Sequence, residues 1–364
     1  MQFTHCLNLG ITTEITYLQR SQIIKSFPNE FNLPPQTLNP VIVKEETQKS
    51  SNASENANNL SNRYWEQINK SSALNKTFNF KVMCYNILAQ KELQWENRMK
   101  QIFKEVNSCE PDIICLQEVQ ESTVQIFCDQ FKQFGYEGFY KKKTNDKIDG
   151  CASFYKTNKW RLEETIEIEF RHPEQPMLAS NNVAIVLKLT PISSPNTPIL
   201  VANTHLVSKD NLTATRVAQM RILLAEIEKH SLTSTRDVIP IILTGDFNSK
   251  PDSAVIRLLN KGCVCISEKQ SLKELGLAEH AMSKKMIFVT HPFKLSSVYE
   301  LKNCSSFQRK FIVDYIYYSH EHLKLLQRLR KPFKRTRGPD EKDASDHLSI
   351  AAVFELEIPE FTSS

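Results

Sequence analysis

Glycine is scarce in this 364-residue chain, which contains only 8. Phosphate-binding loops of the common nucleotide-binding folds rely on closely spaced glycines, because the backbone must approach the phosphates there. No glycine-rich loop of this kind occurs in the sequence. The usual nucleotide-binding classes are therefore excluded.

The nine cysteines form no Cys-x-x-Cys pair, and their number is odd. Zinc sites and disulfide frameworks usually need paired cysteines at characteristic spacings. Cys84, Cys115 and Cys151 instead stand in apolar runs, where a free thiol behaves as a small hydrophobe. We expect a protein of a reducing, intracellular compartment, without zinc or disulfides.

Long hydrophobic runs are also missing, since none approaches the length of a membrane span. The first residues lack the basic-then-apolar order of a secretory signal. We therefore expect a cytoplasmic protein without a membrane segment. The nucleus is the alternative location, because the basic stretch at 324–337 resembles an import signal. No feature indicates a homo-oligomer, so we expect a monomer.

Residues 44–62 contain almost no large apolar side chains and cannot bury enough surface to offset the entropy of ordering. We predict a largely disordered N-terminal extension over residues 1–74, with a short helix at 63–68. The hydrophobic fraction of 40% is enough for a sizeable core, which we place in one domain over residues 75–360. The net charge of +5 favours an anionic partner without requiring one.

From residue 78 onward, short β-rich runs alternate with amphipathic stretches. This alternation is typical of an α/β fold. Apolar residues at helical spacing predict helices at 95–106, 212–229 and 253–260. The β-rich runs predict strands at 80–85, 113–116, 150–155, 183–189, 199–203, 239–244, 312–317 and 348–354.

The segment Thr244–Ser253 reads TGDFNSKPDS and follows an apolar run. Asp246 and Asn248 are two positions apart, so in a strand their side chains point the same way. Carboxylate and amide oxygens at a strand end suit hard cations such as Mg²⁺ or Mn²⁺. The alternative is a turn in which both side chains bind their own backbone.

Asn86 and Glu118 each end a predicted strand, in FKVMCYN and DIICLQE. Side chains at successive strand ends could share one divalent ion, with Glu118 as the direct ligand. A turn asparagine and a helix-capping glutamate are the alternatives. His205 follows the strand ILVANTH, where an imidazole could donate to a phosphate or its leaving oxygen. A structural histidine is the alternative there.

Asp314 stands within the apolar run FIVDYIYY, where a carboxylate needs a partner. His347, in ASDHLSI, is the candidate partner, because a carboxylate can fix the tautomer and orientation of an imidazole. Asp346 is then free to serve the metal. Five polar groups at or within core strands of one chain favour a common site.

The ordered motifs YN, LQE, NTH, TGDFNSKPDS, VDY and SDH together resemble the endonuclease/exonuclease/phosphatase superfamily over residues 80–354. Ser249, Pro251 and Ser253 extend GDFN as in the deadenylase and nocturnin branch. Within that branch, LSSVYE at 295–300 and LKLLQRL at 323–329 resemble the Angel proteins.

The resemblance implies a four-layer α/β sandwich, with two central mixed β-sheets flanked by helices. It implies a Mg²⁺-dependent phosphodiesterase, with Mn²⁺ as the alternative ion, in which water attacks phosphorus in line. The expected metal site consists of Asn86, Glu118, Asp246, Asn248, Asp346 and His347. The expected catalytic residues are His205, Asp246, Asn248, Asp314 and His347.

Basic residues point to an RNA substrate. Lys141, Lys142 and Lys143 lie between predicted strands, and a second cluster at 324–337 includes Lys334 and Arg335. These cations could neutralise phosphates of a single strand while Phe333 stacks a base. The alternative is the solvated face of a helix, because leucines at 323, 325, 326 and 329 form an apolar stripe. Asn182 is a further candidate substrate contact.

The resemblance to this branch implies 3′–5′ trimming of single-stranded RNA, poly(A) included. The resemblance to Angel proteins adds an alternative at the same site, the hydrolysis of 2′,3′-cyclic phosphates at RNA ends. A lipid or inositol phosphodiesterase would share the catalytic core. An adaptor without catalysis, which binds RNA or a translation factor, is the alternative from another class. We expect a partner from mRNA decay or translation.

Overall fold

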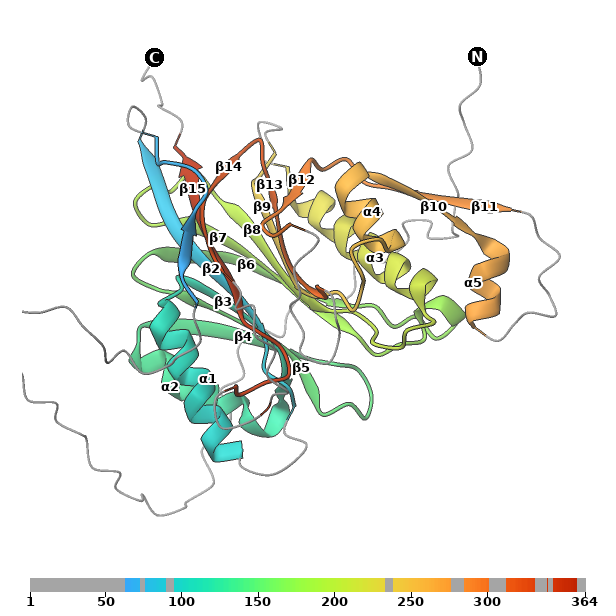
Figure 1. Cartoon of the computed structure of the whole chain (residues 1–364), viewed down its shortest axis with the longest axis horizontal. Coiled ribbons are helices and arrows are strands. Elements are labelled where there is room, and N and C mark those ends of the chain that lie inside the picture. The colour runs from blue at the N-terminus through green and yellow to red at the C-terminus, as the bar shows by residue number, and fades with distance from the viewer. Residues whose placement is uncertain are drawn as a thin grey trace, which may run out of the picture. The chain divides into compact units, whose positions relative to one another are not determined.

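Two β-sheets pack face to face at the centre of the molecule, and helices cover their outer faces (Figure 1). The predicted α/β fold with two mixed sheets and flanking helices is thereby confirmed. The computed structural model describes residues 63–72, 76–89, 95–232, 238–275, 285–300, 312–330, 339 and 343–358.

The first sheet has seven strands, of which β2 and β3 run parallel while the other neighbours pair antiparallel. Its strand β15, the last in chain order, lies between β14 and β2. In spatial order the strands are β1 (Trp65–Gln67), β14 (Leu323–Leu329), β15 (Ile350–Glu357), β2 (Thr77–Asn86), β3 (Ile113–Gln120), β5 (Asp149–Lys156) and β4 (Tyr136–Lys142).

The second sheet has six strands, and here β8 and β9 form the parallel pair. In spatial order the strands are β12 (Leu295–Ser297), β13 (Asp314–Ser319), β9 (Ile241–Asp246), β8 (Ile199–His205), β7 (Val183–Pro191) and β6 (Trp160–Glu169). A separate hairpin is formed by β10 (Cys263–Ser267) and β11 (Met286–Thr290).

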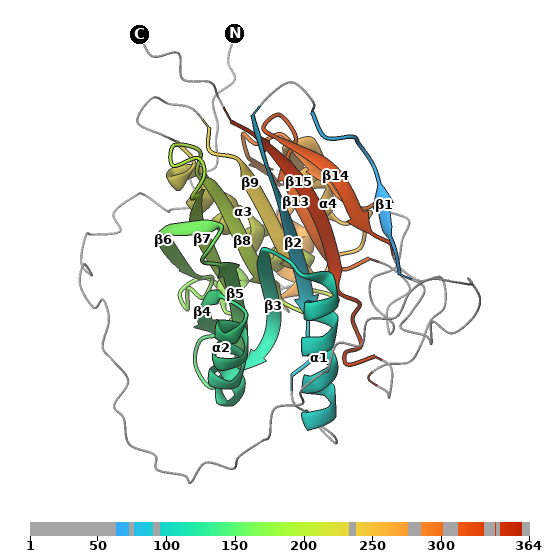
Figure 2. The ribbon, with the colours of Figure 1, turned by 90° about the vertical axis from the view of Figure 1, so that its left-hand side faces the viewer.

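Helices α1 and α2 lie against the first sheet, and α3 and α4 lie on the side of the second (Figures 1 and 2). Among the described residues, none of the helices has both the length and the apolar character needed to cross a membrane. The helices are α1 (Trp95–Cys109), α2 (Val124–Gln133), α3 (Thr213–His230), α4 (Ala254–Lys261) and α5 (Glu268–Glu274), with short 3₁₀ turns at Glu121–Thr123 and Pro176–Leu178.

Aromatic side chains fill the space between the sheets. Phe80 of β2 packs edge-on against Trp160 of β6, and Phe354 of β15 contacts both Phe80 and Tyr318 of β13. Burial of each such large side chain contributes about 1.5–3 kcal/mol to folding. These contacts hold strands of the two sheets against each other.

A buried polar contact also joins the sheets, directly beneath the strand ends. Gln117 Nε2 of β3 donates to Asn203 Oδ1 of β8 over 2.7 Å. Asn203 Nδ2 donates in turn to the carbonyl oxygens of Leu116 and Ala152. Because a buried amide is stable only when its polar atoms are paired, this contact specifies one alignment of β3 with β8.

One predicted helix and one helix considered as an alternative are wrong. The segment expected as a helix at 63–68 contains the strand β1, which pairs antiparallel with β14. The leucine-rich segment of the basic cluster is strand β14, with a bulge between Leu325 and Gln327. The rest of the expected N-terminal extension, up to residue 62, lies outside the described residues, so its disorder stays a prediction.

Candidate active site

Asp246 ends strand β9 beside His205, its register partner at the end of β8. The preceding Gly245 has a φ of +148°, and a Cβ there would lie 2.0 Å from the Thr204 carbonyl oxygen. Only glycine fits so close to the neighbouring backbone, which explains the glycine of the GDFN motif. The close approach of β9 to β8 brings the Asp246 carboxylate next to the imidazole.

The Oδ2 atom of Asp246 is the common neighbour of three side chains from both sheets. Asn86 Nδ2 donates to it over 3.1 Å, His205 Nε2 lies 3.6 Å away, and His347 Nε2 lies 3.8 Å away. Burial and the charge of Asp314 raise the pKa of Asp246, whereas the two histidines lower it. The structure therefore gathers four other predicted site residues around the Asp246 carboxylate: Asn86, His205, Asp314 and His347.

Glu118 occupies a β-bulge in β3, where the register with β5 shifts between Gln117 and Val119. Its φ of +60° is unusual for a residue other than glycine. Bulges redirect side chains, and this one turns the carboxylate toward Asn86. Glu118 Oε1 accepts from Asn86 Nδ2 over 3.2 Å, and Oε2 accepts the Ala89 N–H over 3.0 Å.

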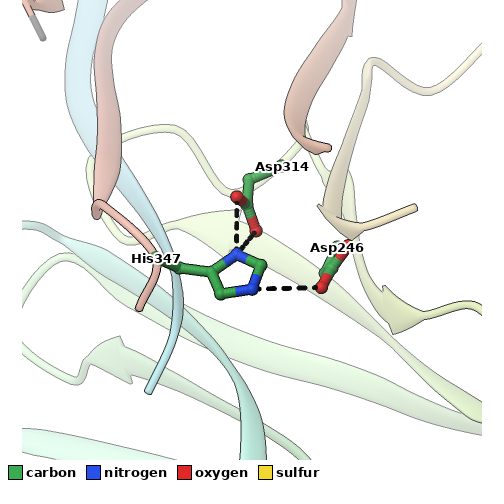
Figure 3. Close-up of side chains that lie close together, drawn as sticks. All are labelled: Asp246, Asp314 and His347. Atoms are coloured by element: carbon green, nitrogen blue, oxygen red, sulfur yellow. Dashed lines mark hydrogen bonds and ion pairs between the residues drawn. The ribbon is translucent and has the colours of Figure 1, made fainter. Parts of the chain in front are cut away.

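His347 lies between two carboxylates (Figure 3). Its Nδ1 donates to Asp314, with distances of 2.8 Å and 3.0 Å to the two carboxylate oxygens, while Nε2 faces Asp246. Burial lowers the pKa of His347, but Asp314, Asp246 and Asp346 raise it to about 10. The ring is therefore a cation at neutral pH.

His205, unlike His347, is neutral at pH 7. Burial and the ammonium group of Lys143 lower its pKa to about 4, against the opposing effects of Asp246 and Glu118. The ring is neutral at pH 7, and its Nδ1 has no hydrogen-bond partner among the described residues. One carboxylate, Asp246, thus contacts both a neutral and a charged imidazole.

Glu118 remains ionised throughout the physiological pH range. Burial raises its pKa, but the positive charge of His205 when protonated, the Ala89 N–H, the Asn86 amide and Lys143 together lower it to about 2. A carboxylate held in the charged form is a strong ligand for a hard cation.

Two asparagines support the strand ends. Asn248 has a φ of +48°, and its Nδ2 donates to the Leu206 carbonyl oxygen over 2.9 Å. Asn182 Nδ2 donates to the His205 carbonyl oxygen over 2.8 Å, and its Oδ1 accepts from Gln219 Nε2 over 3.1 Å. Both ends of the Asn182 amide are thus engaged inside the protein.

Asp346 offers an oxygen that lacks a partner. Its side chain is buried, and Oδ1 has no hydrogen bond among the described residues. The nearest cationic atom is His347 Nε2, 4.0 Å away, and burial raises the pKa of Asp346. A buried carboxylate oxygen without a partner is costly unless a cation or water satisfies it.

The donor set fits a divalent cation. Glu118, Asp246 and Asp346 supply carboxylate oxygens, the ligands that Mg²⁺ and Mn²⁺ prefer. Ligand atoms of Asp246, Asp314 and His347 also lie within 4.8 Å of one another, but a protonated His347 has no free lone pair, so the carboxylates are the candidate ligands. The unsatisfied Oδ1 of Asp346 is the observation that most directly indicates a ligand.

The predicted RNA-binding lysines are engaged in ion pairs. Lys141 and Lys142 belong to strand β4, not to a loop, and Lys143 follows it. Their partners are Glu167 and Glu169 for Lys141, Glu121 for Lys142, and Asp149 for Lys143. Lys334 and Arg335 lie outside the described residues, so their role stays a prediction.

Ser345 is a member of the site that the sequence did not single out. It is fully buried, its Oγ donates to the Asn86 carbonyl oxygen over 2.7 Å, and it accepts the His347 N–H over 3.1 Å. Its place in the SDH motif was the available signal. The electrostatic effect of Lys143 on Glu118 and His205 had no signal in the sequence beyond the charge of the lysine.

The sequence profile of the Endonuclease/Exonuclease/phosphatase family matches residues 83–347. Angel homolog 2 of Bos taurus is 30% identical over 77% of this chain and 70% of its own length. A CCR4-NOT transcription complex subunit 6-like protein of Danio rerio is 29% identical over 82% of this chain and 67% of its own length.

Solved structures give the same relationship. The crystal structure of ANGEL2, a 2′,3′-cyclic phosphatase, in complex with adenosine-2′,3′-vanadate is 31% identical, with a TM-score of 0.70 over 81% of this chain and 99% of that one. The human Nocturnin catalytic domain with bound sulfate is 25% identical, with a TM-score of 0.60 over 80% and 97%. The chain therefore belongs to the endonuclease/exonuclease/phosphatase family, in the branch of the Angel and CCR4-like proteins.

Proposed function

We propose that this protein hydrolyses 2′,3′-cyclic phosphates at the ends of RNA in a reaction that depends on Mg²⁺ or Mn²⁺. The observation that carries the proposal is the likeness to ANGEL2, a 2′,3′-cyclic phosphatase, over 99% of that chain. The convergence of carboxylates and two imidazoles on Asp246 supports a hydrolytic site.

Glu118, Asp246 and Asp346 would hold the cation, with Asn86 orienting Glu118 and Asp246 through its amide. When bound, a divalent cation polarises phosphoryl oxygens and makes water a better nucleophile. Asn248 lies two residues after Asp246, and its backbone N–H fixes the Oδ1 atom of that carboxylate. In this assignment Asn86 orients the carboxylates of Glu118 and Asp246, and Asn248 orients that of Asp246.

The two histidines would stabilise the phosphoryl group in different ways. The His347 cation, held by Asp314, places positive charge where negative charge grows as water attacks phosphorus. Neutral His205 donates a hydrogen bond to a phosphoryl or ribose oxygen without carrying a full charge. Asn182 keeps His205 in place through the backbone carbonyl.

The test uses the purified full chain with Mg²⁺ and RNAs of one sequence, labelled at the 5′ end, that terminate in a cyclic phosphate or a hydroxyl. We expect loss of the cyclic phosphate at constant RNA length, and no reaction after chelation of the metal. Asp246→Asn removes this activity, whereas Asp252→Asn, an exposed neighbour in the same motif, retains it. An intact cyclic end after incubation with wild-type protein and either metal rules the proposal out.

A second candidate is 3′ trimming of RNA. The GDFNSKPDS segment, which resembles the deadenylase branch, and the CCR4-NOT relative favour it. In the same assay, a ladder of shortened products from the RNA with a hydroxyl end supports trimming. The adaptor function would be favoured if folded protein reacts with neither end and Asp246→Asn fully replaces the wild type in cells.

A further inference from the structure

A buried arginine of helix α1 contacts two loops that carry site residues. Arg98 is 5% exposed, and its guanidinium donates to three backbone carbonyls. One NH2 group reaches the carbonyl oxygens of Ile87 and Leu88 over 2.7 Å and 2.6 Å, and Nε reaches that of Ala344 over 2.7 Å. This one side chain therefore joins the loop after β2 to the segment before β15.

The loop after β2 depends on such a contact. Leu88 has a φ of +55°, a conformation that costs a non-glycine residue of the order of 1–2 kcal/mol. Its N–H donates to Asn86 Oδ1 over 3.0 Å, and the next N–H, of Ala89, donates to Glu118 Oε2. The carbonyls bound by Arg98 thus belong to the turn that orients Asn86 and Glu118.

The segment before β15 carries the other ligand. Ala344 is followed by Ser345, which donates to the Asn86 carbonyl oxygen, and then by Asp346 with its unpaired oxygen. The Arg98 charge also interacts electrostatically with Glu118 and Asp346. A contact at Ala344 therefore fixes how far this segment lies from the loop after β2.

Helix α3 has an equivalent arginine. Arg216 is also 5% exposed and donates to the carbonyl oxygens of Val207, Lys209 and Asp210 at 3.2, 2.6 and 2.9 Å. These residues form the loop that follows His205. Arg98 lies in α1 and Arg216 in the first turn of α3, and each of these helices follows a site-bearing strand.

We propose that Arg98 and Arg216 are a matched pair of positioning residues, each of which fixes the backbone of one wall of the site. Arg98 fixes the wall formed by residues 86–89 and 344–347, which carries the cation ligands. Arg216 fixes the wall formed by residues 206–210, which carries the backbone next to His205. The statement that the wall held by Arg98 carries the cation ligands rests on the proposed function.

The guanidinium group is suited to this task. It is always charged and presents several N–H donors in a rigid plane, so one side chain can hold three carbonyls at set distances. Lysine keeps the charge but offers a single, rotatable ammonium group. Arg98→Lys and Arg216→Lys therefore change the geometry of each wall while preserving its charge.

Two measurements on the metal-free and Mn²⁺-titrated full chain test the proposal. Hydrogen exchange should rise at 86–89 and 344–347 in Arg98→Lys, and at 206–210 in Arg216→Lys. The Kd for Mn²⁺, measured by paramagnetic resonance, should rise roughly 10- to 100-fold in Arg98→Lys and stay at the wild-type value in Arg216→Lys. The kcat of Arg216→Lys should fall by roughly 10- to 100-fold.

Because each variant should raise hydrogen exchange only over its own segments, the comparison separates a positioning role from a general loss of stability. If both variants raise exchange over the same segments, or if Arg98→Lys binds Mn²⁺ as tightly as wild type, the proposal is overturned. Should Arg98→Lys not fold, Arg98→Ala with added guanidinium ion restores the missing group for the same measurements. If the wild-type protein binds no Mn²⁺, the proposed function fails. The hydrogen-exchange pattern alone then shows whether each arginine fixes its own wall.

Discussion

Asp246 and Asp314 are direct partners across the antiparallel strands β9 and β13. Like charges at directly opposed positions destabilise a sheet unless a cation compensates them. His347 is that cation, because its ring lies between the two carboxylates and its pKa is raised to about 10. The charge of His347 and the pairing of β9 with β13 are thus linked in one three-residue unit.

The first prediction concerns Asp314→Asn. Removing this charge lowers the pKa of His347, because Asp314 raises it both by charge and by hydrogen bonding. We expect activity to fall roughly 10- to 100-fold, as when a partner that orients a site residue is lost. The pKa of His347 is measured by NMR titration of the metal-free protein. An unchanged pKa would contradict the prediction, and the exposed Asp252→Asn is the control.

The second prediction concerns Glu118→Gln. The variant loses cation binding and turnover, and its melting temperature at neutral pH falls. The reason is that the surroundings of Glu118 lower its pKa to about 2, so the charged carboxylate stabilises the folded state and glutamine cannot replace that contribution. Thermal unfolding without metal measures this, with the exposed Glu121→Gln as control. An unchanged or raised melting temperature would show that the charge of Glu118 does not stabilise the fold.

The third prediction concerns Lys143→Met. The ammonium group lowers the pKa values of both His205 and Glu118, so its removal raises both. The acidic limb of the profile of kcat/KM against pH then shifts to higher pH. Lys142→Met, which loses a surface ion pair with Glu121, leaves the limb in place. Identical profiles for the two variants would refute a role for Lys143 at the site.

The fourth prediction concerns stability and pH at Glu355, far from the site along β15. Burial raises the pKa of this fully buried carboxyl, but hydrogen bonds from Ser71 and Ser72 lower it below the ordinary value. A lowered pKa in the folded state contributes stability above the unfolded pKa, and this contribution is lost as the pH falls through the folded value.

Glu355→Gln should therefore reduce the free energy of unfolding by about 1–3 kcal/mol at neutral pH. The difference from wild type should shrink as the pH is lowered below about 4, because the wild-type carboxyl then becomes protonated. Urea unfolding at several pH values measures it. A difference that does not depend on pH would mean that the charge of Glu355 is unimportant.

The sequence was most informative where the chemistry lies. Asn86, His205 and Asp246 end strands that apolar periodicity identified, Glu118 lies in a bulge near the end of another, and the parallel pairs β2–β3 and β8–β9 bring these residues to one edge. The prediction that Asp314 partners His347 rested on the cost of a buried charge, and the two side chains are hydrogen-bonded. Strand periodicity and the cost of a buried charge are properties of short stretches of sequence, so the features that follow from them can be predicted from the residues.

Strand β14 shows why other parts were misjudged. Its leucines at 323, 325, 326 and 329 imitate a helical stripe, because the bulge between Leu325 and Gln327 breaks the two-residue period of the strand. Strand β6 was missed because a bulge between Leu162 and Glu164 interrupts its alternation. The carbonyl contacts of Arg98 involve backbone atoms, which carry no sequence signal.

The position of β15 has a consequence for biosynthesis. This strand is made after the other strands that the structure describes, yet it fills the middle of its sheet, and the segment just before it brings Asp346 and His347 to the site. A chain still under synthesis holds β2 and β14 without the strand that joins them. The proposed site is therefore incomplete until the residues from Asp346 onward have been synthesised.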